Sequence, residues 1–317
     1  MRKVKLVFMG TPAFAVPSLQ ALYEAGHDIA GVFTQPDRPA GRGGKITASP
    51  VKILAQELKL PLYQPSRIKD PACLETIQQL APECIVVVAY GQILPRAILE
   101  YPVFGCVNVH ASLLPAYRGA APIHWAVING ESKTGVTTML MNEGLDTGDI
   151  LLAKEVDIDV QATTGDIHDR LMMLGAELLL DTLQGLEKGE LQGIPQPDNF
   201  SYAPLLQREH ERLDWSWPAV KIHNRIRGLC PWPGAFTTFR REQLKIWQSE
   251  LVDKKLQPEL LPELLPGEIR LERGEGFLVG TGEGRLKINL LQPAGKKKMT
   301  ALDFYNGRKI STGEQFF

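Results

Sequence analysis

The chain has little cysteine. Its only cysteines are Cys73, Cys84, Cys106 and Cys230, and no two of them form a C-x-x-C pair. Such wide spacing indicates neither a zinc site nor a disulfide framework. Reduced, mostly buried thiols are typical of cytosolic proteins. We therefore expect a cytoplasmic protein that contains no metal.

Long hydrophobic runs are also missing. No stretch of 18 or more apolar residues occurs, which disfavours a membrane-spanning helix. The opening segment, MRKVKLVFMG, runs directly into a strand-like pattern and lacks the features of a signal peptide. The first strand closes on Gly10-Thr11-Pro12 rather than on a G-x-G-x-x-G fingerprint. These absences disfavour a membrane partner and an NAD-dependent enzyme.

Charge of one sign does not dominate the chain, whose formal net charge is −1. This balance argues against a wholly basic nucleic-acid binder. However, residues 1–205 carry 16 Lys and Arg against 22 Asp and Glu, whereas residues 206–317 carry 19 against 14. The basic second part favours contact with a polyanion, and an uneven solvated surface is the alternative.

The length of 317 residues favours two domains. Two different patterns of predicted secondary structure follow one another along the chain. From residue 4 to about residue 186, apolar strand-like runs alternate with helical patterns, as in strands 4–10, 27–35 and 84–91 and helices 13–26, 49–60 and 163–189. This alternation predicts a mostly parallel α/β sheet with helices on both faces. Short strands with Gly-rich turns follow and predict a small β-barrel. We expect domains at 1–188 and 208–317 joined by a linker at 189–207.

Two polar residues stand out in the strand-like segment GCVNVH. Asn108 and His110 alternate with Val107 and Val109, so their side chains point to the same face. They lie at the carboxyl end of the strand, where open α/β sheets bind ligands. The alternative is that both merely satisfy buried backbone groups.

A carboxylate partner is available in the segment MNEGLDTGDIL. Asp146 lies between Gly144 and Gly148, in a loop that joins two strand-like runs. It could be an ordinary turn aspartate, or its carboxylate could fix the His110 tautomer and stabilise the charged ring. An amide, an imidazole and a carboxylate without an evident Ser or Cys nucleophile suit direct acyl transfer to an amine. Asn108 and His110 would stabilise the oxyanion, and the imidazole or a water held by Asp146 would move the proton.

Two extended motifs, NVHASLLPAYRGAAPI and GVTTMLMNEGLDTGDIL, resemble the signature of folate-dependent formyltransferases. The resemblance implies that Asn108, His110 and Asp146 are catalytic, and that 10-formyltetrahydrofolate is the formyl donor. It also implies a folate-site turn, formed by Ser112, Leu113, Leu114 and Pro115.

The resemblance extends over essentially the whole chain for those family members that formylate methionylated initiator tRNA. It rests on FMGTPAFAVPSLQAL, FTQPDRPAGRGGKITASPVK, VVVAYGQILP, RIRGLCPWPGAF and LQPAGKKKMTALDF. It implies a Rossmann-like catalytic domain followed by an OB-like β-barrel domain that binds tRNA. We accordingly expect a monomer that makes N-formylmethionyl-tRNA for translation initiation. The alternatives are formylation of a small amine, such as an amino-sugar nucleotide, and RNA binding without catalysis.

Two basic segments are candidate tRNA contacts. Residues 35–50 form a long polar connection, which is usually functional or disordered. In the family the matching loop engages the acceptor end of tRNA, so we expect Arg42 to be the leading contact, with Arg38 and Lys45 supporting it. The second segment is Lys296, Lys297 and Lys298, which could otherwise be a solvated run. Contacts of this kind would be made to phosphates.

Overall fold

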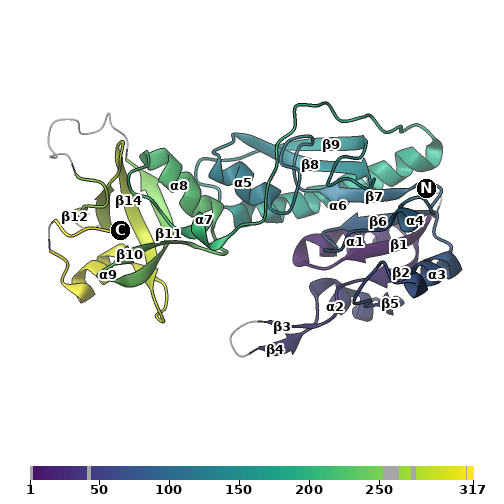
Figure 1. Cartoon of the computed structure of the whole chain (residues 1–317), viewed down its shortest axis with the longest axis horizontal. Coiled ribbons are helices and arrows are strands. Elements are labelled where there is room, and N and C mark those ends of the chain that lie inside the picture. The colour runs from purple at the N-terminus through teal and green to yellow at the C-terminus, as the bar shows by residue number, and fades with distance from the viewer. Residues whose placement is uncertain (1–2, 41–43, 253–263, 273–275, 312) are drawn as a thin grey trace. The chain divides into compact units, whose positions relative to one another are not determined.

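The computed structural model describes residues 3–40, 44–252, 264–272, 276–311 and 313–317 of the chain (Figure 1). Contacts divide the chain into two units. The first comprises Met1–Pro122, Thr134–Val156 and His168–Ala203, and the second comprises Ile123–Lys133, Asp157–Ile167 and Pro204–Phe317. Most of residues 189–207, predicted to be a linker, thus lie in the first unit. No helix in the described part of the chain is long and apolar enough to cross a membrane.

A seven-stranded sheet forms the first unit, in the order β5-β2-β1-β6-β7-β8-β9. Its strands are β1 (Lys5–Gly10), β2 (Asp28–Phe33), β5 (Leu62–Tyr63), β6 (Cys84–Val88), β7 (Cys106–His110), β8 (Lys133–Leu140) and β9 (Ile150–Asp157). Pairing is parallel from β5 to β7 and antiparallel between β7 and β8. The predicted, mostly parallel sheet is confirmed. Because the chain runs from β1 to β2 on one side and returns to β6 on the other, the strand order reverses between β1 and β6. Such sheets bind ligands at the carboxyl ends of the strands near this point.

Helices accompany this sheet, and a short hairpin extends from it. The helices are η1 (Ala13–Ala15), α1 (Val16–Glu24), α2 (Pro50–Glu57), α3 (Pro71–Leu80), α4 (Arg96–Leu99) and α6 (Thr164–Lys188), and the hairpin strands are β3 (Arg38–Ala40) and β4 (Lys45–Thr47). The short helix α5 (Pro122–Ile128) and the first turn of α6 belong almost wholly to the second unit. The predicted helices at 13–26, 49–60 and 163–189 are confirmed as η1 with α1, α2 and α6. The start of α2 shows the local cause: Ser49 Oγ accepts a hydrogen bond from Lys52 N, and Pro50 occupies the first turn.

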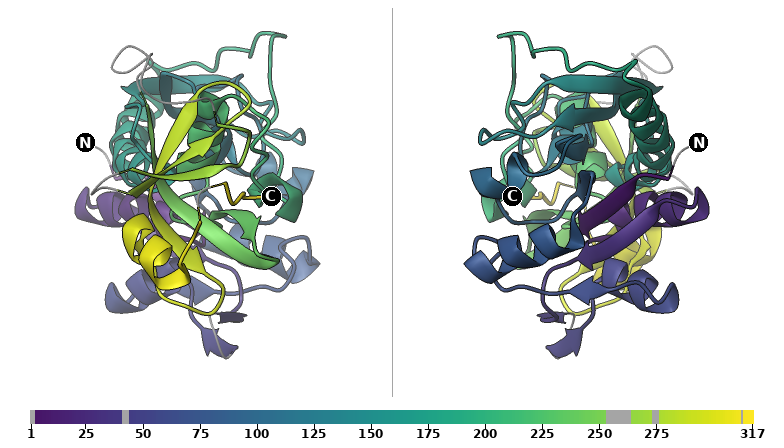
Figure 2. Two further views of the ribbon diagram at one scale, coloured as in Figure 1. Left: turned by 90° about the vertical axis from the view of Figure 1, so that its left-hand side faces the viewer. Right: turned by 90° about the vertical axis from the view of Figure 1, so that its right-hand side faces the viewer.

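Opposite faces of the sheet pack against different helices. Ile77 of α3 and Ile98 of α4 share a buried cluster with Val7, Ile85 and other strand residues. On the α6 side, a Cβ added to Gly175 would lie only 2.9 Å from Val109 Cγ1. A glycine therefore lets the helix approach β7 closely. The right panel of Figure 2 shows β1 and β2 in purple within this sheet.

The second unit is built on antiparallel strands in the order β10-β11-β14-β13-β12, with β15 paired to β14. Its elements are α7 (Arg208–Glu211), α8 (Ala219–Gly228), β10 (Ala235–Phe239), β11 (Glu242–Leu251), β12 (Ile269–Glu272), β13 (Gly276–Gly280), β14 (Arg285–Pro293), β15 (Met299–Thr300) and α9 (Ala301–Arg308). Ile222 and Ile226 of α8 join the buried core between the strands. The described pairs establish a smaller antiparallel sheet (Figure 2, left panel), and its closure into a barrel stays a prediction.

Candidate active site

Strand β7 delivers Asn108 and His110 to one face of the sheet. All five of its residues are buried, and Asn108 and His110 remain 9% and 6% exposed. Since Val109 contacts α6, the alternation of a strand points the two polar side chains to the opposite face. Asn108 and His110 therefore share one face of β7, as the alternation in the sequence predicts.

The imidazole of His110 has two different neighbours. Its Nε2 lies 3.1 Å from the Tyr117 carbonyl oxygen, and its Nδ1 lies 3.7 Å from Asp146 Oδ2. A carbonyl oxygen can only accept, so Nε2 carries the hydrogen of this bond. The Tyr117 carbonyl, rather than the Asp146 carboxylate, thus fixes the tautomer. Nδ1 is left facing the carboxylate as the nitrogen that can exchange a proton.

The Asp146 loop reaches β7 from the β8–β9 connection. Asp146 Oδ2 accepts a hydrogen bond of 2.8 Å from Gly119 N. The backbone of Asp146 is left-handed, with φ 52°. A Cβ on Gly148 would collide with the Leu140 carbonyl oxygen, so only glycine allows this close turn. The three residues that the sequence singled out therefore lie together, although they come from two separate segments.

The amide of Asn108 is available for a ligand. Within the described ranges, no side chain or backbone group forms a hydrogen bond with it. Its polar atoms are not among the fully enclosed, unpartnered ones, so solvent or a ligand can reach them. This vacancy matches a donor aimed at a developing oxyanion.

The turn at Ser112–Pro115 follows directly after β7. Thr137 Oγ1 of β8 donates a hydrogen bond of 2.7 Å to the Ser112 carbonyl oxygen and accepts one of 3.1 Å from Leu114 N. Ser112 Oγ donates 2.6 Å to the Ala116 carbonyl oxygen. The predicted folate-site residues are thereby held in a fixed turn beside the strand that carries Asn108 and His110.

Neither of the two cysteines on the neighbouring strands is suited to nucleophilic catalysis. Burial raises the pKa of the Cys106 thiol to about 12 and also raises the pKa of Cys84. Both groups therefore remain thiols near neutral pH, and a thiol is not the reactive form. Over the described residues, no group of three His, Cys, Asp or Glu side chains is placed to hold a metal ion.

The predicted tRNA loop is partly an ordered hairpin, because β3 and β4 pair with Arg38 opposite Thr47. Its base is fixed by Asp37, whose carboxylate pKa is lowered by hydrogen bonds from Lys52 and then from Gln64. Arg38 Nη2 donates 3.0 Å to Gln35 Oε1. Lys45 opens β4, and only its backbone is described. Arg42 lies outside the described residues.

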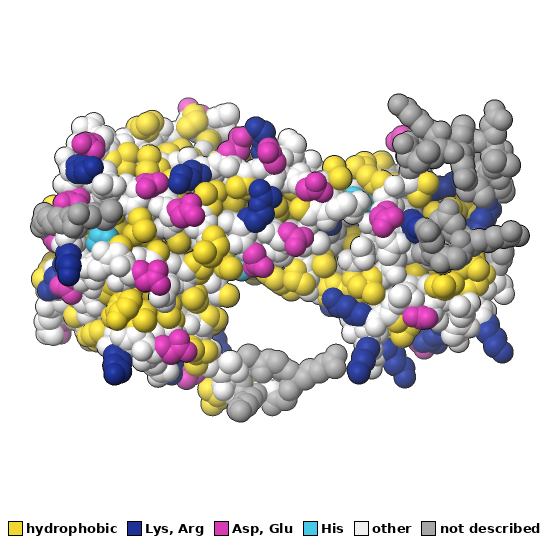
Figure 3. All heavy atoms as spheres, turned by 180° about the vertical axis from the view of Figure 1, so that it is seen from behind, with side chains coloured by type: hydrophobic (Ala, Val, Ile, Leu, Met, Phe, Trp, Pro, Cys, Tyr) yellow, Lys and Arg dark blue, Asp and Glu magenta, His cyan; other side chains and the backbone are white. Residues whose placement is uncertain are grey.

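The cations of the second unit fall into two classes. Lys296, Lys297 and Lys298 are exposed between β14 and β15, and Lys298 Nζ lies 3.7 Å from the centroid of the Trp247 ring. By contrast, Arg227 is only 6% exposed and donates to the Ala162 carbonyl oxygen at 3.0 Å. Arg227 is therefore held by backbone of the same unit and is not part of the exposed basic surface. On the face seen in Figure 3, Lys and Arg side chains gather along the lower edge of this unit, at the right of the picture.

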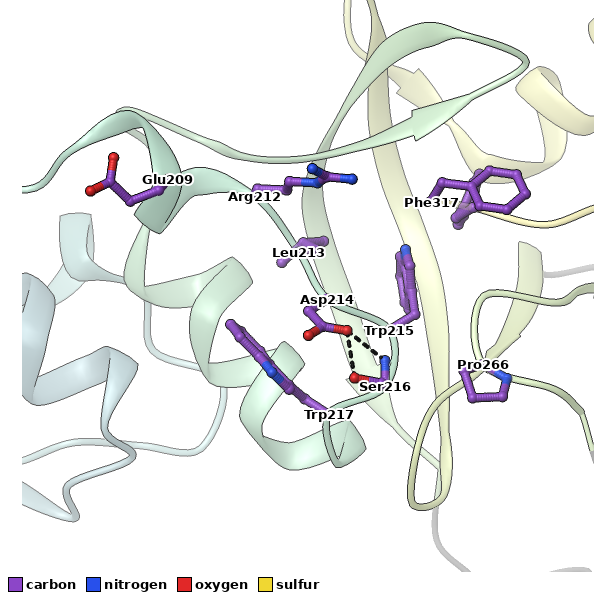
Figure 4. Close-up of a pocket in the computed structure, with 10 residues that line it drawn as sticks. Glu209, Arg212, Leu213, Asp214, Trp215, Ser216, Trp217, Pro266 and Phe317 are labelled. Atoms are coloured by element: carbon purple, nitrogen blue, oxygen red, sulfur yellow. Dashed lines mark hydrogen bonds between the residues drawn. The ribbon is translucent and has the colours of Figure 1, made fainter.

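Two cavities lie in the second unit. One, of about 490 Å³, contains none of the predicted site residues and is lined by Glu209, Arg212, Leu213, Asp214, Trp215, Ser216, Trp217, Pro266, Phe316 and Phe317 (Figure 4). Figure 4 shows that the Asp214 carboxylate accepts hydrogen bonds from Ser216, so it closes a local turn. The other cavity, of about 430 Å³, includes Lys298 and Trp247.

Sequence reasoning missed two residues beside the Asp146 loop, of which Gln196 contacts the loop and Arg118 contacts Gln196. Arg118 lies inside the motif NVHASLLPAYRGAAPI, and Gln196 lies in the segment predicted to be a linker. Arg118 Nη2 donates 2.7 Å to Gln196 Oε1, and Gln196 Nε2 donates 2.9 Å to the Asp146 carbonyl oxygen. Arg118 is the only Lys, Arg, Asp or Glu of that motif, which was the available signal for it. Gln196 gave none.

Comparison with known proteins identifies relatives across the whole chain. A formyl transferase family model matches residues 2–183, and a model of the formyl transferase C-terminal domain matches residues 205–309. The methionyl-tRNA formyltransferase of Alkaliphilus oremlandii is 49% identical over 311 residues, which cover 98% of each chain. That of Pelotomaculum thermopropionicum is 50% identical over 310 residues, covering 98% of this chain and 97% of the relative.

A solved structure shares the fold at much lower identity. The N-formyltransferase of Helicobacter canadensis, in complex with folinic acid and dTDP-3-aminofucose, matches with a TM-score of 0.67 and 19% identity. The match covers 92% of this chain and 99% of that one.

Proposed function

The chain belongs to the formyltransferase family, and we propose on this basis that it transfers the formyl group of 10-formyltetrahydrofolate to methionyl initiator tRNA. The acceptor is the α-amino group of the methionine, and the product is N-formylmethionyl-tRNA for translation initiation. The observation that carries the proposal is the 49–50% identity, over 98% of the chain, to methionyl-tRNA formyltransferases. Both family models are matched, including the C-terminal domain.

The reaction joins the amine nitrogen to the formyl carbon and breaks the bond from that carbon to N10 of the folate. A free α-amino group has a pKa of about 7.7–8.0, so a useful neutral fraction exists near pH 7. Attack places negative charge on the formyl oxygen, which the unpartnered Asn108 amide can stabilise as a donor. The amine loses one proton and N10 gains one, so a group that accepts and returns a proton balances the reaction.

In our proposal, that proton passes through Nδ1 of His110. Nε2 is occupied by the Tyr117 carbonyl oxygen, whereas Nδ1 faces Asp146 Oδ2 at 3.7 Å. The carboxylate supplies an opposite charge when the ring is protonated. The folate lies against the turn Ser112–Pro115. The chemistry therefore needs orientation, one oxyanion donor and a proton relay, and no metal.

Two basic segments, by this proposal, contact the tRNA. The first is the segment 35–50 with Arg38, Arg42 and Lys45, and the second is the exposed run at Lys296–Lys298. Support comes from the exposure of the lysine run and from the excess of 19 basic over 14 acidic residues in residues 206–317. Lys and Arg in such places neutralise phosphates without reading bases. We further propose that the protein acts as a monomer in the cytoplasm, where translation starts, and light scattering on the purified chain tests the monomer.

A direct assay tests the reaction. The purified protein is incubated with 10-formyltetrahydrofolate and methionylated initiator tRNA, and formylmethionyl-tRNA is measured. An amino-sugar nucleotide and glycinamide ribonucleotide serve as competing acceptors. Of the three acceptors, we expect only the methionylated tRNA to be formylated. Formylation of a small amine would instead support the other acceptor class, and tRNA binding without turnover would support a non-catalytic protein.

A further inference from the structure

The segment before Ala203 is hydrogen-bonded to the chain that follows the Ser112–Pro115 turn. Arg118 N donates 2.9 Å to the Ser201 carbonyl oxygen, and Ala203 N donates 2.7 Å to the Arg118 carbonyl oxygen. Upstream, Ile194 and Ile150 exchange two backbone hydrogen bonds of 2.8 Å. The segment is therefore anchored at both ends, and Gln196 lies between the anchors.

Gln196 uses its whole side-chain amide. Oε1 accepts from Arg118 Nε at 3.0 Å and from Nη2 at 2.7 Å. Nε2 donates to the carbonyl oxygens of Asp146 at 2.9 Å and of Gly148 at 2.7 Å. A glutamine has two acceptor sites and two donor hydrogens, so these four bonds fill its capacity.

The two carbonyls that Gln196 binds belong to the strained part of the Asp146 loop. A left-handed non-glycine residue such as Asp146 costs energy and persists only when its surroundings hold it. The carbonyl groups on Asp146 and Gly148 set the path of this turn. By binding both, Gln196 fixes the backbone from which the Asp146 carboxylate projects.

The contacts form a closed ring. Arg118 binds Gln196, Gln196 binds the Asp146 backbone, and the Asp146 carboxylate accepts from the amide of Gly119, which is covalently joined to Arg118. Arg118 is 6% exposed and stacks 4.5 Å from the centroid of the Phe200 ring. None of the described carboxylates forms an ion pair with it. A buried cation without an acidic partner is costly, which indicates a role for this arrangement beyond stability.

We propose that Gln196, held by Arg118, is a positioning residue that fixes the Asp146 carboxylate against Nδ1 of His110. This inference rests on the proposed function, because it acts only if Asp146 contributes to formyl transfer. Gln196 does not touch the reacting atoms. Its loss should therefore lower the rate of the chemical step and leave substrate binding unchanged.

The first test is Gln196→Leu in the full-length protein, with Gln192→Leu as the matched control. Gln192 is an exposed glutamine four positions earlier in the same segment. Displacing a group by about 1 Å can cost about 100-fold in rate. We expect Gln196→Leu to lower kcat by about 10- to 100-fold with KM values for folate and tRNA within about twofold. The control should keep wild-type constants. A raised KM with unchanged kcat would overturn the proposal.

A double-mutant cycle separates this proposal from the proposed function. In an Asp146→Ala background, Gln196→Leu should change single-turnover formyl transfer by less than about twofold, since coupled residues are not additive. The same fold-loss in both backgrounds would show that Gln196 acts elsewhere and would overturn the positioning role. If Asp146→Ala alone had wild-type turnover, the catalytic assignment of Asp146 would fail, and the positioning role would fail with it.

Hydrogen exchange provides a measurement that does not depend on turnover. Gly119 N donates to Asp146 Oδ2, so its protection reports the position of the carboxylate. We expect Gln196→Leu and Gln196→Glu to lower this protection. The Glu variant keeps an acceptor for Arg118 but puts a carboxylate beside two carbonyls. Unchanged Gly119 protection in both variants would contradict the ring of contacts.

Discussion

Nδ1 of His110 faces Oδ2 of Asp146 across 3.7 Å. This separation is too long for a hydrogen bond and short enough for strong interaction between a charged ring and a carboxylate. In ligand-free sites such contacts are often long and tighten only when the substrate is bound. In the proposed reaction, this pair would respond to the proton that the attacking amine releases.

Removal of the charge at position 146 should affect catalysis far more than folding. Asp146→Asn keeps an oxygen for Gly119 N, and asparagine tolerates the left-handed backbone. We expect kcat to fall by about 10²–10⁴, the usual contribution of positioned proton transfer, and His110→Ala to fall within the same range. Turnover and thermal unfolding should be measured together, with exposed Asp28→Asn as control. Near-normal turnover of either variant would contradict the assigned roles.

Asn108→Ala tests the oxyanion donor. Removing one such donor typically costs about 2.7–4 kcal/mol, or about 10²–10³ in kcat. The free energy of unfolding should change little in comparison, because no described group forms a hydrogen bond with the amide. Saturating kinetics and urea unfolding give the two numbers. A large loss of stability with normal kcat would favour a purely structural asparagine.

Neutralising the lysine run should weaken tRNA binding in a salt-dependent way. The double variant Lys296→Gln/Lys297→Gln removes two exposed cations without disturbing the Lys298–Trp247 contact. The slope of log K against log salt should become shallower by roughly one for each lost phosphate contact. Lys59→Gln/Lys69→Gln, which changes two exposed lysines of the first unit, is the control. An equal slope in both double variants would exclude the lysine run from the interface.

The stability of the second unit should fall in mild acid. Burial lowers the pKa of His223, whose Nδ1 lies 3.0 Å from Ser249 Oγ and whose Nε2 lies 3.0 Å from the Val160 carbonyl oxygen. The unfolded chain therefore binds the proton more tightly, and stability is lost as pH falls below about 6.5 toward the lowered pKa. Urea unfolding between pH 5 and pH 7.5 should show a steeper decline for the wild type than for His223→Gln. Identical slopes would assign the pH dependence to other groups.

Local geometry explains why much of the first unit could be predicted. Apolar strand runs, helical periodicity and caps such as Ser49 act within a few residues, so sheet and helices followed from the pattern. The hairpin β3–β4 did not, because its Pro- and Gly-rich sequence resembles a loop. Its base is held by Lys52 and Gln64, which lie 15 and 27 positions from Asp37.

The sequence alone determined that Asn108 and His110 share a face, because side-chain alternation is a property of any strand. Its motifs also placed Asp146 in a tight glycine-flanked turn. Only the tertiary structure decided that the Tyr117 carbonyl sets the tautomer, and that Gln196, 50 positions from Asp146, holds the loop. Hydrogen bonds between distant segments depend on where the folded sheet brings them, and no local pattern of residues encodes that meeting.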